Sequence, residues 1–267
     1  MVRIETEENE PVGDVLWGGS LSSLESKKNL FEVYWSDNED NAIYKNTDGF
    51  ITRFTMVPSV IMVNSNLIGG IKINGYEDLL NPELKGKIAF ADPSKSSSSY
   101  EQLLNQIWAM GQGDEEVGWD YVEALVENLD GQLLEGSSAV YNGVVQGEFV
   151  VGLTFEEPAA KFVENGAPVK IIYPVEGTLV SPDGVSIIKN APHLAYAQEF
   201  VDFVTSYEIQ TFITTELNRR SIRNDVSEAG GLISYEAIDL VENDQKWSAD
   251  NKIALLERYN KVFREGE

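Results

Sequence analysis

Short segments rich in β-branched residues alternate along this chain with longer segments whose apolar residues recur at helical spacing. The strand-like segments include "KIAFA", "FVVGLTF", "APVKIIYPV" and "DGVSIIKN". Helix-like segments such as "DEEVGWDYVEALVENL" and "HLAYAQEFVDFVTS" lie between or after them. Because strands and helices that alternate in this way pack as a sheet covered by helices, the order predicts the α/β class with parallel or mixed sheets.

One long apolar segment, "GFITRFTMVPSVIMVNSNLI", contains Pro58 at its middle. Proline has no N–H to donate to a neighbouring strand. We therefore expect two extended pieces that meet at Pro58 rather than one central strand.

The charge of the chain narrows its possible partners. It has 20 Lys and Arg residues against 44 Asp and Glu residues, a net charge of −24. Such a surface repels nucleic acid and anionic membranes, so we predict no nucleic-acid partner. No segment of the sequence approaches the roughly 18 apolar residues of a membrane span.

The sequence offers few residues for catalysis. It has no cysteine, which excludes disulfides, thiol catalysis and cysteine metal sites, and its one histidine is His193, predicted at a helix start. No P-loop, G-x-S-x-G or H-E-x-x-H motif is present. We predict a protein that is not an enzyme and needs no cofactor.

Hydroxyl side chains gather where three predicted helices begin. Ser98 and Glu101 have the S-x-x-E spacing of a capping box, which leaves the rest of the serine run 96–99 in surplus. Ser137 or Ser138 is expected to cap a second helix, and Thr154 with Glu157 fits the same spacing at a third. Helix N-termini bind anions through unpaired amides, so these junctions predict an anion site.

Each junction also has a purely structural interpretation. Ser and Thr are common N-caps, and acids such as Glu156 and Glu157 in a first helical turn complement the helix dipole. Alternatively, the two glutamates meet an ammonium group, a sugar hydroxyl or a metal ion. Trp17, at a strand end beside glycines, fits a ligand-facing position and core packing equally well.

Several segments in order resemble one known family. They are "GDVLWGGS", "INGYEDLLNPELKGKIAFADPSKSSSSYEQL", "AVYNGVVQGEFVVGLTFEEPAAKFVENGAPVKIIYPVEGT" and "DGVSIIKNAPHLAYAQEFVDFVTSYEIQTFI". Together they resemble the extracellular solute-binding proteins of ABC importers. The branch they resemble is ferric-binding-protein-like and includes receptors for aminoethylphosphonate, phosphoglycerate and hexose phosphates.

The resemblance implies a type II periplasmic-binding-protein-like fold of two α/β lobes, joined by crossing strands near 52–63 and 172–182. Lobe 1 would comprise 1–58 and 178–232, and lobe 2 would comprise 59–177 and 233–267. A ligand would lie between them. The residues implied for its site are Trp17, Gly19, Ser20, Ser96, Ser97, Ser98, Ser99, Tyr100, Ser137, Ser138, Thr154, Glu156 and Glu157.

The ligand implied by the resemblance is a small anion with a phosphonate or phosphate group. Iron-binding members have a consecutive tyrosine pair where this chain has Glu157-Pro158. Because this tyrosine pair is absent, a ferric or other metal-ion receptor is the alternative and not the leading interpretation. A truncated, non-binding remnant is the second alternative.

The resemblance also bears on the chain ends and on partners. Members of the family have a strand, a helix and a second strand before the segment that resembles "RIETEENEPVGDV", so lobe 1 is expected to be incomplete at its N-terminus. A homodimer formed by strand exchange could complete it. The implied partner is the membrane permease of the importer. The implied location is extracellular or periplasmic, with or without a lipid anchor, and the sequence shows no leader.

Overall fold

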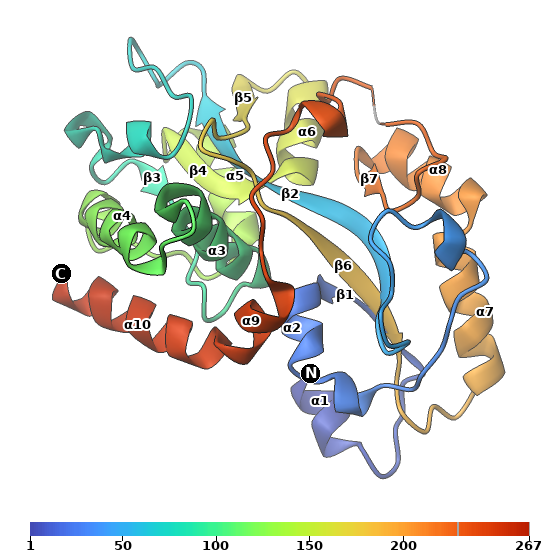
Figure 1. The fold of residues 1–267 in the computed structure, drawn as a ribbon. Helices are drawn as coiled ribbons and strands as arrows, with labels where there is room; N and C mark the ends of the chain where they lie inside the picture. The colour runs from blue at the N-terminus through green and yellow to red at the C-terminus, as the bar shows by residue number, and fades with distance from the viewer. Residues whose placement is uncertain (229, 267) are drawn as a thin grey trace. The chain divides into compact units, whose positions relative to one another are not determined.

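In the computed structural model the chain forms two compact units (Figure 1). Unit 1 comprises Met1–Val57 and Ser181–Gly230, and unit 2 comprises Pro58–Val180 and Gly231–Glu267. The structure describes residues 1–228 and 230–266; residues 229 and 267, which the predicted lobes include, lie outside the described residues. Each unit has hydrophobic clusters of its own and is described by itself.

The sheet of unit 2 is built on the second half of a long strand, β2 (Thr52–Asn64). β4 (Val151–Phe155) and β5 (Val169–Ile172) pair with β2 antiparallel, and the short β3 (Ile88–Ala89) pairs with β4 parallel. The predicted α/β class with mixed sheets is therefore confirmed.

Alternating residues of these strands bury both faces of the unit 2 sheet. Ile61, Ile88 and Leu153 pack on one face with residues of α3 (Ser97–Gly111), α4 (Glu115–Leu129) and α10 (Lys252–Glu265). Val60 and Ala89, one position along each strand, pack on the other face with residues of α5 (Ser137–Gln146) and α6 (Glu156–Glu164). Because side chains alternate across a strand, this pattern produces a sheet between two helical layers (Figure 1).

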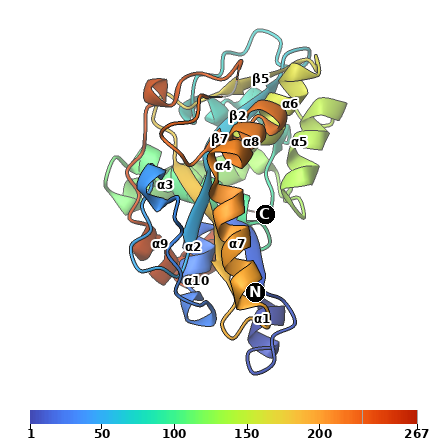
Figure 2. The ribbon, with the colours of Figure 1, turned by 90° about the vertical axis from the view of Figure 1, so that its right-hand side faces the viewer.

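Unit 1 repeats this arrangement of a sheet between two helical layers. The sheet order runs β1 (Val15–Ser20), β6 (Val180–Ile187) and β2, and β7 (Arg220–Ser221) pairs with β2. One face packs on α7 (Leu194–Thr205) and α8 (Tyr207–Leu217), which Figure 2 shows in front of β2. The other face packs on α2 (Leu21–Glu25) and on α1 (Val2–Thr6).

β2 is one continuous strand of 13 residues, so the expected break at Pro58 is wrong. Thr55 and Met56 pair with β7, whereas the ladder to β4 begins at Ser59. Pro58 therefore lies where β2 changes partners, and its missing N–H removes no bond from either of these two ladders.

The remaining elements are short. The segment after β2 contains two 3-10 turns. No helix of the described ranges is long and apolar enough to cross a membrane. The two turns after β2 are η3 (Glu77–Leu80) and η4 (Pro82–Leu84). The other short elements are η1 (Lys28–Leu30), η2 (Glu39–Asn41), η5 (Tyr235–Ala237) and α9 (Gln245–Asp250).

Candidate functional site: an edge of the unit 2 sheet and a polar cluster in unit 1

Three helices of unit 2 begin at one edge of its sheet. β3 and β4 run parallel, so their carboxyl ends reach the same edge, where α3 and α6 follow them. α5 follows Leu134, which forms a parallel bridge with Ala91 just beyond β3. Ligands of open α/β sheets bind outside the carboxyl ends of strands, so this edge is the candidate site in unit 2.

Ser96, not Ser98, caps α3, so the predicted capping box of Ser98 and Glu101 is wrong. The Ser96 hydroxyl accepts the N–H of Ser99 at 3.3 Å and lies 3.1 Å from the Ser98 hydroxyl. Glu101 is 5% exposed, because the helix turns this position into the interior instead of back toward the cap.

The serine run and Tyr100 differ in burial. Ser97 is exposed and Ser98 is half-buried, whereas Ser99 and Tyr100 are buried. The Tyr100 hydroxyl donates to the Ser248 carbonyl at 2.6 Å. Ser97 and Ser98, in the first turn of α3, are therefore the members of the serine run that reach the surface, and Tyr100 packs in the unit 2 core.

An ion pair links the loops before α3 and α5. Lys95 Nζ lies 2.9 Å and 3.0 Å from the two carboxylate oxygens of Glu135, and 3.8 Å from Asp92 Oδ2. The lysine is thus neutralised by local carboxylates. The pair places the start of α5 beside the serine loop.

α5 begins without a side-chain cap, which corrects the prediction that Ser137 or Ser138 caps it. Gly136 is the N-cap residue, and no side-chain hydrogen bond caps this end in the described structure. Ser137 and Ser138 are the first two helical residues, one half-buried and the other exposed. The amides of this first turn therefore lie at the edge with no side-chain acceptor from the N-cap.

α6 begins at Glu156, one residue later than the predicted cap at Thr154 implies. Phe155 is the N-cap residue and its side chain forms no capping bond. Glu156 is 1% exposed and accepts a hydrogen bond from the Tyr173 hydroxyl, and Glu157 is half-buried in the same turn. Both glutamates lie where acids complement the helix dipole.

Thr154 is instead the last buried residue of β4, and its hydroxyl is unusual. Its side chain is 1% exposed, and Oγ1 has no hydrogen-bond partner among the described residues. Side chains alternate along β4, so Thr154 lies on the same face of the strand as Gly152. That face lies against α5, because a Cβ added at Gly152 would lie 2.7 Å from Val144 and 3.0 Å from Val140 of α5. The hydroxyl thus lies beneath the α5 layer, next to the start of α6.

The predicted unit 1 residues lie at the end of β1. Trp17 is 53% exposed, and its ring centroid lies 5.2 Å from that of Phe54 and 5.4 Å from that of Phe200. Gly19 has φ +99°, which favours glycine. Ser20 is the N-cap residue of α2, and its hydroxyl lies 3.2 Å from Ser22 Oγ and 3.0 Å from Ser23 Oγ.

A charged pair that the sequence did not reveal lies next to these residues in unit 1. Asp183 is the register partner of Ser20 and is 6% exposed. It accepts hydrogen bonds from Arg219 and from the Thr55 N–H and hydroxyl. Burial raises the pKa of the Asp183 carboxyl, and this effect outweighs the opposing charge of Arg219.

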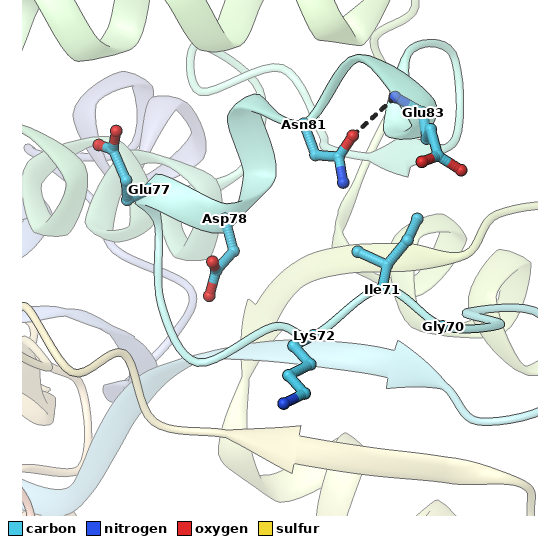
Figure 3. Close-up of a pocket in the computed structure, with 7 residues that line it drawn as sticks. All are labelled: Gly70, Ile71, Lys72, Glu77, Asp78, Asn81 and Glu83. Atoms are coloured by element: carbon cyan, nitrogen blue, oxygen red, sulfur yellow. Dashed lines mark hydrogen bonds between the residues drawn. The ribbon is translucent and has the colours of Figure 1, made fainter.

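A separate pocket of unit 2, with a volume of about 620 Å³, contains none of the predicted site residues. Figure 3 shows its lining, in which Asp78 comes from η3 and Lys72 from the loop segment that faces it. The Asp78 carboxylate accepts the N–H groups of Asn74 and Gly75 at 2.6 Å and 3.3 Å, which fixes its loop. Across residues 1–228 and 230–266, no three His, Asp or Glu side chains come together in a group that could hold a metal ion.

Comparison with known proteins gives consistent relatives. A family model described as "Bacterial extracellular solute-binding protein" matches residues 24–223. A Haemophilus influenzae protein of uncharacterised function is 29% identical over 96% of this chain and 78% of its own length. Iron uptake protein A1 of Synechocystis is 26% identical over 79% of this chain and 62% of its own length.

Solved structures agree. The periplasmic binding protein AfuA from Actinobacillus pleuropneumoniae, solved with exogenous fructose-6-phosphate bound, has a TM-score of 0.87 and 26% identity, covering 98% of this chain and 86% of that one. The ferric binding protein from Campylobacter jejuni has the same fold, with a TM-score of 0.77 and 23% identity over 99% of this chain and 86% of that one. With the family model matching 200 of 267 residues, the chain belongs to the bacterial extracellular solute-binding proteins.

Proposed function

We propose that this protein is the receptor of an ABC importer for a small anionic solute that carries a phosphate or phosphonate group. The single observation that carries the proposal is the Thr154 hydroxyl, which is buried and has no described partner at the edge where three helices begin. An unsatisfied buried hydroxyl costs about 1–3 kcal/mol, and a bound anion would satisfy it.

The neighbouring helix starts supply the other donors. The first turn of α5 has no side-chain cap, and its amides belong to Ser137 and Ser138. Uncapped amides at a helix N-terminus attract a phosphate group through their partial charge and their N–H donors. Ser97 and Ser98 add hydroxyls from the loop that the Lys95–Glu135 pair holds beside α5.

Glu156 and Glu157 argue for a ligand that is not anionic throughout. Two carboxylates in the first turn of α6 would repel a second anionic group. They would suit the hydroxyls of a sugar phosphate or the ammonium of an aminophosphonate. The bound hexose phosphate in the similar AfuA structure supports the first of these classes.

The remaining parts of the proposal follow from the family. The receptor would act outside the cytoplasm, either in solution or held by a lipid anchor, and would deliver its solute to a membrane permease.

Isothermal titration calorimetry tests the proposal directly. The unmodified protein is titrated with fructose-6-phosphate, phosphoglycerate and aminoethylphosphonate, with fructose as the matched neutral control. Binding of at least one anion, with no heat from fructose, is the expected result. Heat from fructose alone, or from none of the compounds, would reject an anion receptor.

A ferric-ion receptor is the second candidate, because the Tyr173 hydroxyl and the buried Glu156 carboxylate contact one another. Phenolate and carboxylate oxygens suit a hard cation such as Fe³⁺. Titration with ferric citrate would then produce a visible tyrosinate-to-iron absorbance band that Tyr173→Phe removes and a chelator reverses. A titration that stays colourless eliminates this candidate.

A further inference from the structure

Arg219 is held in a fixed orientation at the surface of unit 1. Its Nε donates to the Thr55 hydroxyl at 2.7 Å, and its Nη2 donates to Asp183 Oδ2 at 2.5 Å. The guanidinium carbon lies 6.0 Å from the centre of the Phe54 ring. Contacts on two edges and one face leave a long side chain little rotational freedom, so the guanidinium plane is set before any ligand arrives.

The residues that hold Arg219 are themselves fixed. Asp183 Oδ1 accepts the Thr55 N–H at 3.0 Å and the Thr55 hydroxyl at 2.6 Å, while Oδ2 accepts from Arg219. The Thr55 hydroxyl donates to Asp183 and accepts from Arg219, so the three side chains form a closed ring of hydrogen bonds. The carboxylate is engaged at both oxygens within this ring.

Among the arginines of unit 1, Arg219 has intermediate exposure. Arg53, Arg220 and Arg223 are buried at 5%, 2% and 7% exposure, whereas the Arg3 side chain is 74% exposed. The Arg219 side chain is 24% exposed, so it can contact a solute. It is also mostly shielded from water, so its attraction for an anion is screened less than that of a fully exposed arginine.

Arg219 also lies among the predicted unit 1 site residues. Ser20 is the register partner of Asp183, and Trp17 stacks edge-on against Phe54, the ring that Arg219 faces. The exposed indole and the guanidinium therefore share one aromatic support. A planar cation beside an exposed aromatic ring is suited to a solute with an anionic group attached to an apolar or sugar body.

We infer that Arg219 is the unit 1 residue that binds the anionic group of the solute, and that Asp183 and Thr55 are positioning residues that aim its guanidinium. This inference rests on the proposed function. A guanidinium has five N–H donors in a planar fork that matches the oxygens of phosphate and phosphonate, so it favours a dianion of that shape over a monoanion.

The experiment compares two solutes of similar shape that differ in charge. Fructose-6-phosphate is a dianion at pH 8, because the second phosphate pKa is about 6, whereas fructose 6-sulfate has a similar shape and one charge. Both are titrated by calorimetry into the unmodified protein, Arg219→Gln, Arg219→Lys and Thr55→Val. The control is Arg258→Gln, which removes the same charge from α10, where Arg258 pairs with Glu116 at 2.6 Å.

Arg219→Gln should weaken the phosphate by about 10- to 100-fold and the sulfate by clearly less, since a charge-assisted hydrogen bond to the dianion is lost. Arg219→Lys should fall between, because it keeps the charge and loses the planar fork. Thr55→Val should show a smaller loss with the same preference for the dianion. Arg258→Gln should bind both probes as the unmodified protein does.

The outcomes distinguish a failure of the proposed function from a failure of the role inferred for Arg219. If the unmodified protein binds neither probe nor any other anion of the panel, the proposed function fails and the inference fails with it. If it binds fructose-6-phosphate and Arg219→Gln binds it equally well, the function stands and the inference is overturned. Equal losses for both probes, with a lowered urea unfolding midpoint, would make Arg219 a structural residue and also overturn the inference.

Discussion

The substitution Thr154→Val should make the protein more stable and a poorer receptor. The Thr154 hydroxyl is buried without a described partner, so folding removes it from water without replacing its hydrogen bond. Replacing it with a methyl group removes a penalty of about 1–3 kcal/mol. Valine also suits a strand, so we expect the free energy of unfolding to rise by about 1–2 kcal/mol.

The same substitution removes a donor to the ligand. A hydrogen bond to a charged group contributes about 1.5–3 kcal/mol, which corresponds to an affinity loss of about 10- to 100-fold. Stability is measured by urea unfolding followed by tryptophan fluorescence, and affinity by calorimetry with the anion that the unmodified protein binds. The opposite directions of the two effects separate a ligand-binding hydroxyl from a structural one.

Thr178→Val is the matched control. Thr178 is fully buried in unit 2, and its hydroxyl also has no described partner, but it lies on a segment that bridges Leu240 rather than at the helix starts. It should stabilise the protein by a similar amount and leave affinity unchanged. A Thr154→Val protein that is less stable than the original, or that binds as tightly, would refute the reasoning.

Two further predictions concern packing and pH. An added Cβ at Gly118 of α4 would lie 2.1 Å from the carbonyl oxygen of Ile107 in α3, so Gly118→Ala should destabilise unit 2 by about 1–3 kcal/mol although alanine has the better helix propensity. Gly70 has open space around it, so Gly70→Ala should change stability little. Equal urea unfolding midpoints for the two variants would contradict this prediction. Because burial raises the pKa of Asp183, the folded state binds its proton more tightly than the unfolded state does, so this group adds stability as pH falls through its raised pKa toward the usual value near 3.9 and loses it as pH rises. Asp183→Asn should remove that component, and unfolding curves between pH 4 and pH 7 that keep the same pH dependence would show that Asp183 does not supply it.

The sequence was sufficient for the elements whose pattern is set by burial. Val60 and Ile61 face opposite layers because successive residues of a strand alternate, and the continuous apolar run at residues 60–63 is what a strand buried on both faces requires. The amphipathic helices after residue 96 could also be predicted, because their apolar residues recur at helical spacing. Family membership followed from the order of such segments.

Helix starts were less predictable, because a cap depends on where the apolar face begins. The S-x-x-E spacing at Ser98 indicated a capping box, yet the N-cap lies two residues earlier at Ser96, and Glu101 packs inward. Gly136 and Phe155 occupy the other two cap positions, where neither residue offers a side-chain acceptor. Uncapped ends of this kind have no local sequence signal.

The charged cluster of unit 1 was invisible for a different reason. Thr55, Asp183 and Arg219 are each more than 30 residues apart along the chain, and their contact depends on how β2, β6 and the start of β7 lie together. Arg219 and Arg220 are adjacent in the sequence, and the sequence alone does not indicate which of them joins the cluster. Which of the two reaches the surface depends on the alternation at β7.

The continuity of β2 has a consequence for how the molecule unfolds. Its residues 55 and 56 belong to a ladder of unit 1, and its residues 59 to 63 to a ladder of unit 2. Neither sheet can therefore release this strand without fraying the other, and local opening in one unit becomes a shared event. Amide hydrogen exchange should show similar opening free energies for Thr55 and Ile61. A solute bound at either end of β2 should then slow exchange along the whole strand.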